Sequence, residues 1–446
     1  MACTVCFFSN TYQNLLKCRS FGSDSFEKKL LDYKSFYLFE LKNLKSIKDC
    51  KCTFYKEGDV YIKWTDGFLR NLQSNMKTVE DTFDALIKIY YNYISKSNKD
   101  ALESIWQFLE YNSLLKEEAS PLLANRLLFR ARIKKEKLNK DDILEYFHIP
   151  FNKRRSVKNQ RFSISGQPML YLSSSVFAVE KEMELDVNKL CIAAFLPHKI
   201  IHKKFYQVHN PIYDVIVRVL PVVCAAGSKI DYFNDDVAPN HKTIIPDIKK
   251  SILFQILTFP THKKGTFIEE YVLPQMLTTA LLNHKFNGIV FNSTKNYADI
   301  SNADIQAEYD LNVAFFVNYY VFTKKYDEDL LDSFIYFLPE KRQLLRLIIE
   351  KIIESTRQVV HYISRNKSNR QERVESINEK IMDVLCLSGQ KGNVYNAPLA
   401  NAKRYLENLQ TAKIKGRNYF DTNEGRLELE FYHRMVDELE QRLKKS

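Results

Sequence analysis

Apolar residues divide the chain into regions of different spacing. Between Thr65 and Leu123 they recur every three or four residues, as in DTFDALIKIYYNYIS and ALESIWQFLEYNSLL, which predicts amphipathic helices. From Arg126 to about Phe322, short apolar runs alternate with turn signals and a few helical pieces, and LCIAAFL, VIVRVL, GIVFN and LNVAFFVNYYVF predict strands. After Lys324 the spacing is helical again, with a break predicted at the polar segment SRNKSNRQER.

This pattern predicts an α+β protein with a mixed β core and flanking helices, plus mainly helical N- and C-terminal regions. We predict four regions along the chain. They are a cysteine-containing lead-in of zinc-ribbon type (1–64), a helical region (65–123), a mixed domain that would hold the site (124–325) and a helical C-terminal region (326–446).

Composition narrows the classes of function. The 66 Lys and Arg residues exceed the 54 Asp and Glu residues, and the resulting net charge of +12 favours acidic partners such as phosphate-bearing small molecules, nucleic acid or an acidic protein. The chain has 11 glycines and no Gly-rich phosphate loop, which argues against a P-loop or a dinucleotide-binding fingerprint.

The sequence predicts a soluble, cytoplasmic protein. The N-terminus MACTVCFFSNTYQN lacks the pattern of a secretory signal. No segment reaches the ~18 consecutive apolar residues of a membrane span, because the longest apolar stretch, DVIVRVLPVVCAAG, is interrupted by Arg218 and Pro221.

Four of the eight cysteines form two close pairs near the N-terminus. Cys3 and Cys6 make a C-x-x-C pair, and Cys50 and Cys52 make a C-x-C pair. Two such pairs on tight turns can meet as a four-sulfur zinc site, which would be structural. The alternative is a set of reduced free thiols, since a chain without a secretory signal is not expected to carry a disulfide framework.

Three residues of the mixed region could bind an anionic ligand. Arg130 in LLFRARI and Arg161 in NQRFS carry planar guanidinium groups that suit pyrophosphate or carboxylate. Tyr171 ends the apolar run GQPMLY. By spacing alone, solvated arginines and a half-buried strand tyrosine are the more usual explanation.

The motifs LFRARI, FHIPFNKRRSVKNQRFSISGQPMLYLSSSVFAVEKEM, EEYVLPQMLTTALLNHKFNGIVFNSTK and YDLNVAFFV resemble, in order, those of the RES family. The run from Phe147 to Met183 is the most specific part. The resemblance implies an ADP-ribosyltransferase-like fold and an enzyme that consumes NAD. Many members of the family are bacterial toxins restrained by a partner antitoxin.

The resemblance also implies roles for individual residues. Arg130 and Arg161 would hold the pyrophosphate or an incoming phosphate, and Tyr171 would border the nicotinamide ribose. The family glutamate matches Glu182 rather than Glu180, and residues two apart on a helix point about 200° apart, so they cannot both face one cleft.

Two further positions match less completely. The family serine falls on Ser293, which would hydrogen-bond the acceptor or a phosphate. The tyrosine that usually stands two residues earlier is replaced by Phe291, which removes a hydroxyl. Asn312 matches a polar position near the end of the domain.

The chemistry of NAD fits this set. Nicotinamide leaves as a neutral ring, so the difficulty lies in the positive charge that develops on the ribose, and one carboxylate can stabilise it. We expect Glu182 to do so. The acceptor stays open: water gives a glycohydrolase, inorganic phosphate a phosphorylase, and a protein an ADP-ribosyltransferase. The predicted partners are NAD, phosphate, an antitoxin or regulatory protein and, through the helical extensions, a second copy of the chain.

Other interpretations compete with this one. Arg357 and His361 in RQVVH lie on one helix face, as in HEPN-type ribonucleases, although a solvated helix face is the simpler explanation. The net charge and the cysteines also suit a nucleic-acid-binding module. A third alternative retains the fold without catalysis and uses the helices as a scaffold for partners.

Overall fold

The computed structural model describes residues 2–20, 25–52, 59–115, 123, 126–135, 138–200, 203–219, 241–261, 267–293, 311–319, 324–339, 362–391, 396–414 and 417–445. The chain forms two compact units, each built from three separate segments. Unit 1 comprises Met1–Glu117, Val157–Gln167 and Tyr206–Asn296, and unit 2 comprises Glu118–Ser156, Pro168–Phe205 and Tyr297–Ser446. Each unit therefore combines segments from more than one predicted region.

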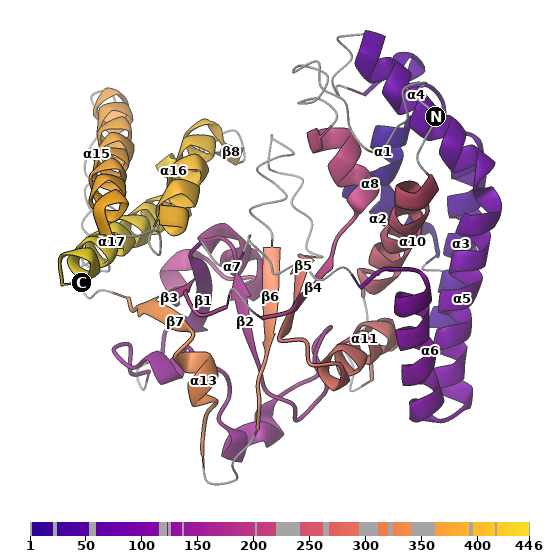
Figure 1. The fold of residues 1–446 in the computed structure, drawn as a ribbon, viewed down its shortest axis with the longest axis horizontal. Coiled ribbons are helices and arrows are strands. Elements are labelled where there is room, and N and C mark those ends of the chain that lie inside the picture. Colours follow the sequence, from indigo (N-terminus) through magenta and orange to yellow (C-terminus); the bar gives the residue numbers. More distant parts are fainter. Residues whose placement is uncertain are drawn as a thin grey trace. The chain divides into compact units, whose positions relative to one another are not determined.

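Unit 1 is mainly helical. In it, α3 packs on α5, α5 packs on α6 and α10, and α6 packs on α11, with the long helices side by side in Figure 1. Its strands β4 and β5 are hydrogen-bonded neighbours. The elements are α1 (Thr4–Phe8), α2 (Asn10–Arg19), α3 (Phe26–Lys42), η2 (Ile47–Asp49), α4 (Asp59–Ser74), α5 (Met76–Ser95), α6 (Asn98–Tyr111), β4 (Phe205–Val208), α8 (Pro211–Asp214), η6 (Val215–Val219), α10 (His241–Leu257), η7 (Glu269–Tyr271), α11 (Val272–Asn283) and β5 (Gly288–Asn292).

Aromatic rings fill the core of unit 1. Helix α5 buries Val79, Phe83, Leu86 and Tyr90 at three- and four-residue spacing, which is the stripe that its sequence predicts. Phe83 meets Tyr33 and Tyr37 of α3 edge to face, with ring centroids 5.7 and 5.1 Å apart.

Unit 2 is built on five strands in the order β6-β2-β1-β3-β7, and each neighbouring pair is antiparallel. Strand β3 is buried along its whole length, which explains why its sequence is a continuous apolar run rather than an alternating one. The strands are β1 (Leu128–Ile133), β2 (Met169–Ser173), β3 (Leu190–Pro197), β6 (Leu311–Phe316) and β7 (Phe334–Phe337).

Helices of unit 2 share one apolar core with these strands. Residues of β1 and β3, of helix α7 and of the C-terminal helices belong to the same buried cluster. The helices α15, α16 and α17, in orange and yellow, pack on one another in Figure 1, and α17 contacts α7. These elements are η3 (Ile143–Glu145), η4 (Phe151–Ser156), α7 (Val176–Met183), η5 (Val187–Lys189), α13 (Glu328–Leu331), α15 (Tyr362–Lys391), α16 (Asn396–Thr411), the β8–β9 pair (Lys413–Ile414 and Arg417–Asn418), η9 (Tyr419–Asp421) and α17 (Asn423–Lys445).

The α+β class with flanking helices is confirmed, and LCIAAFL, GIVFN and LNVAFF are strands as predicted. The strand predicted at VIVRVL is wrong. Asn210 caps a helical turn that begins at Pro211, and the chain continues from it as the π-helical turn Val215–Val219.

The break predicted at SRNKSNRQER is also wrong, because α15 runs through it. The segment is polar but contains neither Gly nor Pro, and Arg, Lys, Gln and Glu are good helix formers. Residues 4–8, 10–19 and 26–42 of the predicted ribbon-type lead-in are helical. Within the described residues, no helix is both long enough and apolar enough to cross a membrane.

Candidate functional site

Strand β1 presents Arg130 as a half-buried cation in unit 2. Its Nη1 donates to the carbonyl of Tyr171 on the neighbouring strand β2, at 3.1 Å. Burial and the nearby charge of Arg132 lower the pKa of Arg130 from its usual value. Among the described residues, no carboxylate forms an ion pair with Arg130, so this guanidinium is suited to attract an anion.

Glu182 lies in the last turn of α7, and its carboxylate accepts a hydrogen bond from a residue of strand β6. The Nδ2 of Asn312 donates to Glu182 Oε1 at 2.9 Å, and the hydroxyl of Ser173 donates to Asn312 Oδ1 at 2.6 Å. Ser173 and Asn312 are opposite each other in the β2–β6 register and are both buried, whereas Glu182 is exposed. The bond from Ser173 determines which way the amide points, so the amide presents its NH₂ group to the carboxylate.

Glu180 contacts different elements of unit 2. Its carboxylate accepts from the N–H of Val187 at 3.3 Å and shares a hydrogen bond with Glu424 of α17. Burial, and then the proximity of Glu424, raise the pKa of Glu180 to about 7. The two glutamates of α7 therefore have separate surroundings, with Glu182 directed to β6 and Glu180 to η5 and α17.

A buried carboxylate joins the start of α7 to the C-terminal helices. Glu428 is 0% exposed and accepts from the N–H of Val176 at 3.3 Å, from Tyr405 Oη at 2.9 Å and from Tyr419 Oη. Burial raises the pKa of Glu428 to about 7, although the three donors favour its charged form. The helix that carries Glu182 is thus anchored at its first residue.

Arg161 and Ser293 belong to unit 1. Arg161 Nη1 donates to the carbonyl of Leu257, the last residue of α10, at 3.0 Å, and its guanidinium lies 5.0 Å from the centre of the Tyr271 ring. A cation at a helix C-terminus is favourable, which gives Arg161 a structural role. Ser293 directly follows β5 and is 8% exposed. Phe291 packs on Phe162 with ring centroids 4.5 Å apart.

The structure thus divides the six predicted ligand-binding residues between the units. Unit 2 joins Arg130 to Tyr171 and Glu182 to Asn312, while unit 1 holds Arg161 and Ser293. Arg357 and His361, the pair of the ribonuclease interpretation, lie outside the described residues.

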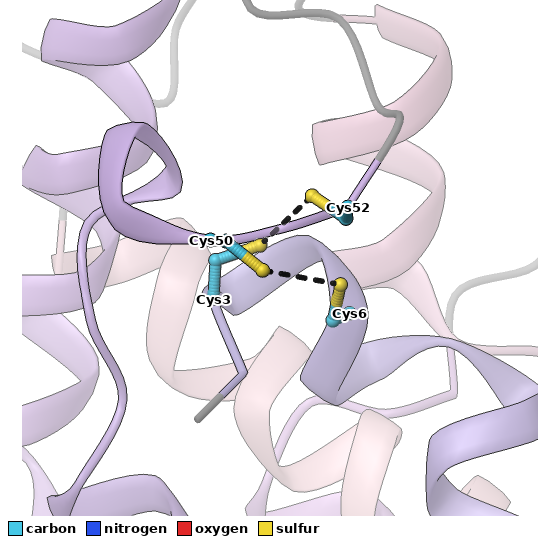
Figure 2. A group of neighbouring side chains, drawn as sticks. All are labelled: Cys3, Cys6, Cys50 and Cys52. Carbon is cyan, nitrogen blue, oxygen red and sulfur yellow. Dashed lines mark hydrogen bonds between the residues drawn. The ribbon is translucent and has the colours of Figure 1, made fainter.

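The four paired cysteines come together in unit 1 (Figure 2). Their sulfur atoms all lie within 4.8 Å of one another, with Cys3 Sγ 3.8 Å from Cys52 Sγ and Cys6 Sγ 3.7 Å from Cys50 Sγ. Cys3 and Cys50 are buried, and Cys6 and Cys52 are partly exposed. Such a set of thiols can bind a soft metal ion.

Ser173 and Glu428, which hold the site residues in place, were not predicted from the sequence. Ser173 carries no motif of its own, because its partner is set by strand pairing. Glu428 did carry a signal. In GRLELEFYHRMVDEL it falls on the same helix face as Phe431, Tyr432 and Met435, and a charged residue within an apolar stripe marks a buried charge with partners.

Comparisons with known proteins give one partial likeness. No family model matches the chain, and no solved structure matches it. Over 125 residues the sequence is 32% identical to a protein of Bacillus subtilis (strain 168) named "Putative toxin YopC". The match covers 28% of this chain and 27% of that protein, so the chain spans about a quarter of the length of this relative.

Proposed function

We propose that the chain is a toxin that consumes NAD by cleaving the bond between nicotinamide and ribose, with Glu182 as the catalytic carboxylate. The observation that carries the proposal is the hydrogen-bonded series from Ser173 to Asn312 to Glu182, which holds an exposed carboxylate with a buried amide. The resemblance to the RES family and the name of the Bacillus relative support the two parts of the proposal, NAD and toxin respectively.

Glu182 would act on charge that develops during the reaction. The bond between ribose C1′ and the nicotinamide nitrogen breaks, and its electron pair neutralises the pyridinium ring. The ribose becomes cationic, and a carboxylate next to it lowers the energy of that state. The amide of Asn312 keeps Glu182 in one orientation before the charge appears, so little reorganisation is needed.

The acceptor then bonds to C1′ and loses a proton when it is water. Arg130 of the same unit would attract the pyrophosphate of NAD, because its half-buried guanidinium lacks a carboxylate partner among the described residues. The roles predicted for Arg161 and Ser293 stay predictions, since the proposal rests on unit 2.

To test the proposal, the purified full chain is incubated with NAD, with and without inorganic phosphate, and the products are separated by chromatography. Free ADP-ribose indicates hydrolysis, phosphorylated ADP-ribose indicates phosphorolysis, and label retained on protein indicates transfer. We expect Glu182→Gln to slow the loss of NAD by about 100-fold or more, as expected when an electrostatic group of the transition state is removed.

Glu180→Gln is the matched control, because Glu180 lies on the same helix and contacts η5 and α17 instead of β6. It should keep most of the activity. Equal losses in both variants would contradict the assignment of Glu182. An absence of NAD loss with the unchanged chain, even with a cell extract as a source of acceptors, would refute the enzyme. Growth arrest on expression that Glu182→Gln relieves would support the toxin.

A further inference from the structure

The cysteine cluster of unit 1 joins two segments that are far apart in the sequence. Cys3 precedes α1 and Cys6 lies within it, whereas Cys50 and Cys52 follow the short helix η2. Cys3 and Cys52, whose sulfurs lie 3.8 Å apart, are 49 residues apart along the chain, and Cys6 and Cys50, at 3.7 Å, are 44 residues apart. All four thiols point toward one another in Figure 2.

Two of the six sulfur–sulfur separations match a mononuclear tetrahedral site. In a tetrahedron with metal–sulfur bonds of about 2.3 Å, neighbouring sulfurs lie about 3.8 Å apart. These two separations are 3.8 and 3.7 Å, and the other four do not exceed 4.8 Å. A disulfide would require about 2.0 Å between two sulfurs, so the four atoms are arranged around a common centre rather than as two bonds.

We propose that Cys3, Cys6, Cys50 and Cys52 bind one zinc ion as a closed structural site. Four thiolates select a soft or borderline metal, and zinc accepts a tetrahedral sulfur set without redox chemistry. With all four positions taken by protein ligands, no position remains for a substrate, so the ion stabilises the fold and takes no part in a reaction.

The ion would fasten the N-terminal segment to unit 1. Apart from the cysteines, the two segments are joined by the N–H of Lys45, which donates to the carbonyl of Ala2 at 3.1 Å, in a bridge between Cys3 and Lys45. Phe7 and Phe8 of α1 are 0% and 1% exposed, and Phe7 packs on Tyr37, so the ion would add to the packing that already holds α1. Lys45, Lys48 and Lys51 flank the second pair and offset the negative charge of a zinc tetrathiolate.

The test uses the full chain, purified with a reducing agent and without chelator. Elemental analysis should find one zinc per chain. Cobalt should replace zinc and give the visible absorption bands of a tetrahedral cobalt thiolate. Cys52→Ser should lose most of the bound metal, whereas Cys18→Ser should retain it, because Cys18 is an exposed cysteine outside the cluster.

Alkylation of the unchanged chain keeps the test informative if a variant fails to fold. The exposed thiols of Cys18 and Cys386 should react at once, while the four cluster thiols should react only after a strong chelator is added. Three outcomes would each overturn the proposal. They are a chain that contains no zinc and takes up no cobalt, disulfides within the cluster in freshly prepared protein, and bound iron instead of zinc. None of these readouts depends on NAD.

Discussion

The two units bury charges of opposite sign and compensate them differently. In unit 1, Lys17 of α2 is 1% exposed, and its Nζ donates to one neutral partner, the hydroxyl of Thr258, at 3.3 Å. In unit 2, Glu428 is 0% exposed and accepts from three donors. Burial, together with the nearby Arg161, lowers the pKa of Lys17 well below its usual range, while burial raises the pKa of Glu428 to about 7.

The two units hold their segments together by different means. Unit 2 uses a buried carboxylate as a connector, because its three donors belong to α7, α16 and η9. Unit 1 does not use Lys17 in this way, since burial beside a single hydroxyl partner disfavours the charged form of its amine. The N-terminal segment of unit 1 is held by Phe7 packing on Tyr37, by Asn210 donating to the carbonyl of Phe8 and, in our proposal, by the cysteine cluster.

Removal of the proposed zinc should have the largest effect and should be confined to unit 1. An ion whose free concentration is a thousand times its dissociation constant contributes about 4 kcal/mol to the free energy of unfolding. Both tryptophans, Trp64 and Trp106, belong to unit 1, so urea unfolding followed by tryptophan fluorescence reports on this unit. A chelator should lower the free energy of unfolding obtained from that curve by at least this amount.

Hydrogen exchange of the amides of β1, β2 and β3 reports on the stability of unit 2. Its rates should not change when the chelator is added. Equal destabilisation of both units would mean that the cluster stabilises the whole chain and not unit 1 alone. An unchanged fluorescence curve would show that the cluster does not stabilise unit 1.

Glu428 should contribute to the pH dependence of unit 2. Below pH 4.5 its carboxyl is protonated in both states. Between about pH 4.5 and 7 the unfolded chain releases the proton and the folded chain keeps it, so the free energy of unfolding falls as the pH rises, by roughly 3 kcal/mol in total.

Glu428→Gln should remove this fall, and hydrogen exchange of α7 at pH 5 and pH 7 measures it. Glu180 has a similarly raised pKa, but it is present in both proteins and its contribution cancels in the comparison. A variant whose stability still falls by the same amount between these pH values would assign the effect to another carboxyl group.

Parts of this picture could be predicted from the sequence, and the reasons differ by element. Periodicity identified α5 because its buried residues recur within one helix, and the two cysteine pairs indicated their own convergence by their short spacing. Glu428 could not be matched to its partners, because Val176 lies 252 residues away and only the folded core brings the two together.

The helix through SRNKSNRQER was missed for a related reason. Among the described side chains of α15, the buried apolar residues Val374, Ile377 and Ile381 follow the polar segment, so packing further along the chain supports a helix that this segment does not itself indicate. For the site, the family resemblance suggested the residues, but their division between two units depends on how the segments assemble.

The last expected effect concerns Lys17 and has the opposite sign to that of Glu428. Above pH 10.5 this amine is neutral in both states. As the pH falls, the unfolded chain takes up a proton and the folded chain does not, so unit 1 loses up to about 1.4 kcal/mol per pH unit until the lowered pKa is reached. Lys17→Met, which fills the site with an apolar chain of similar length, should not lose this stability. The tryptophan unfolding curves of the two proteins should therefore separate between pH 9 and pH 7, with the variant the more stable at pH 7. A variant that is less stable at both values would show that Lys17 is charged and paired, and that the two units treat their buried charges alike.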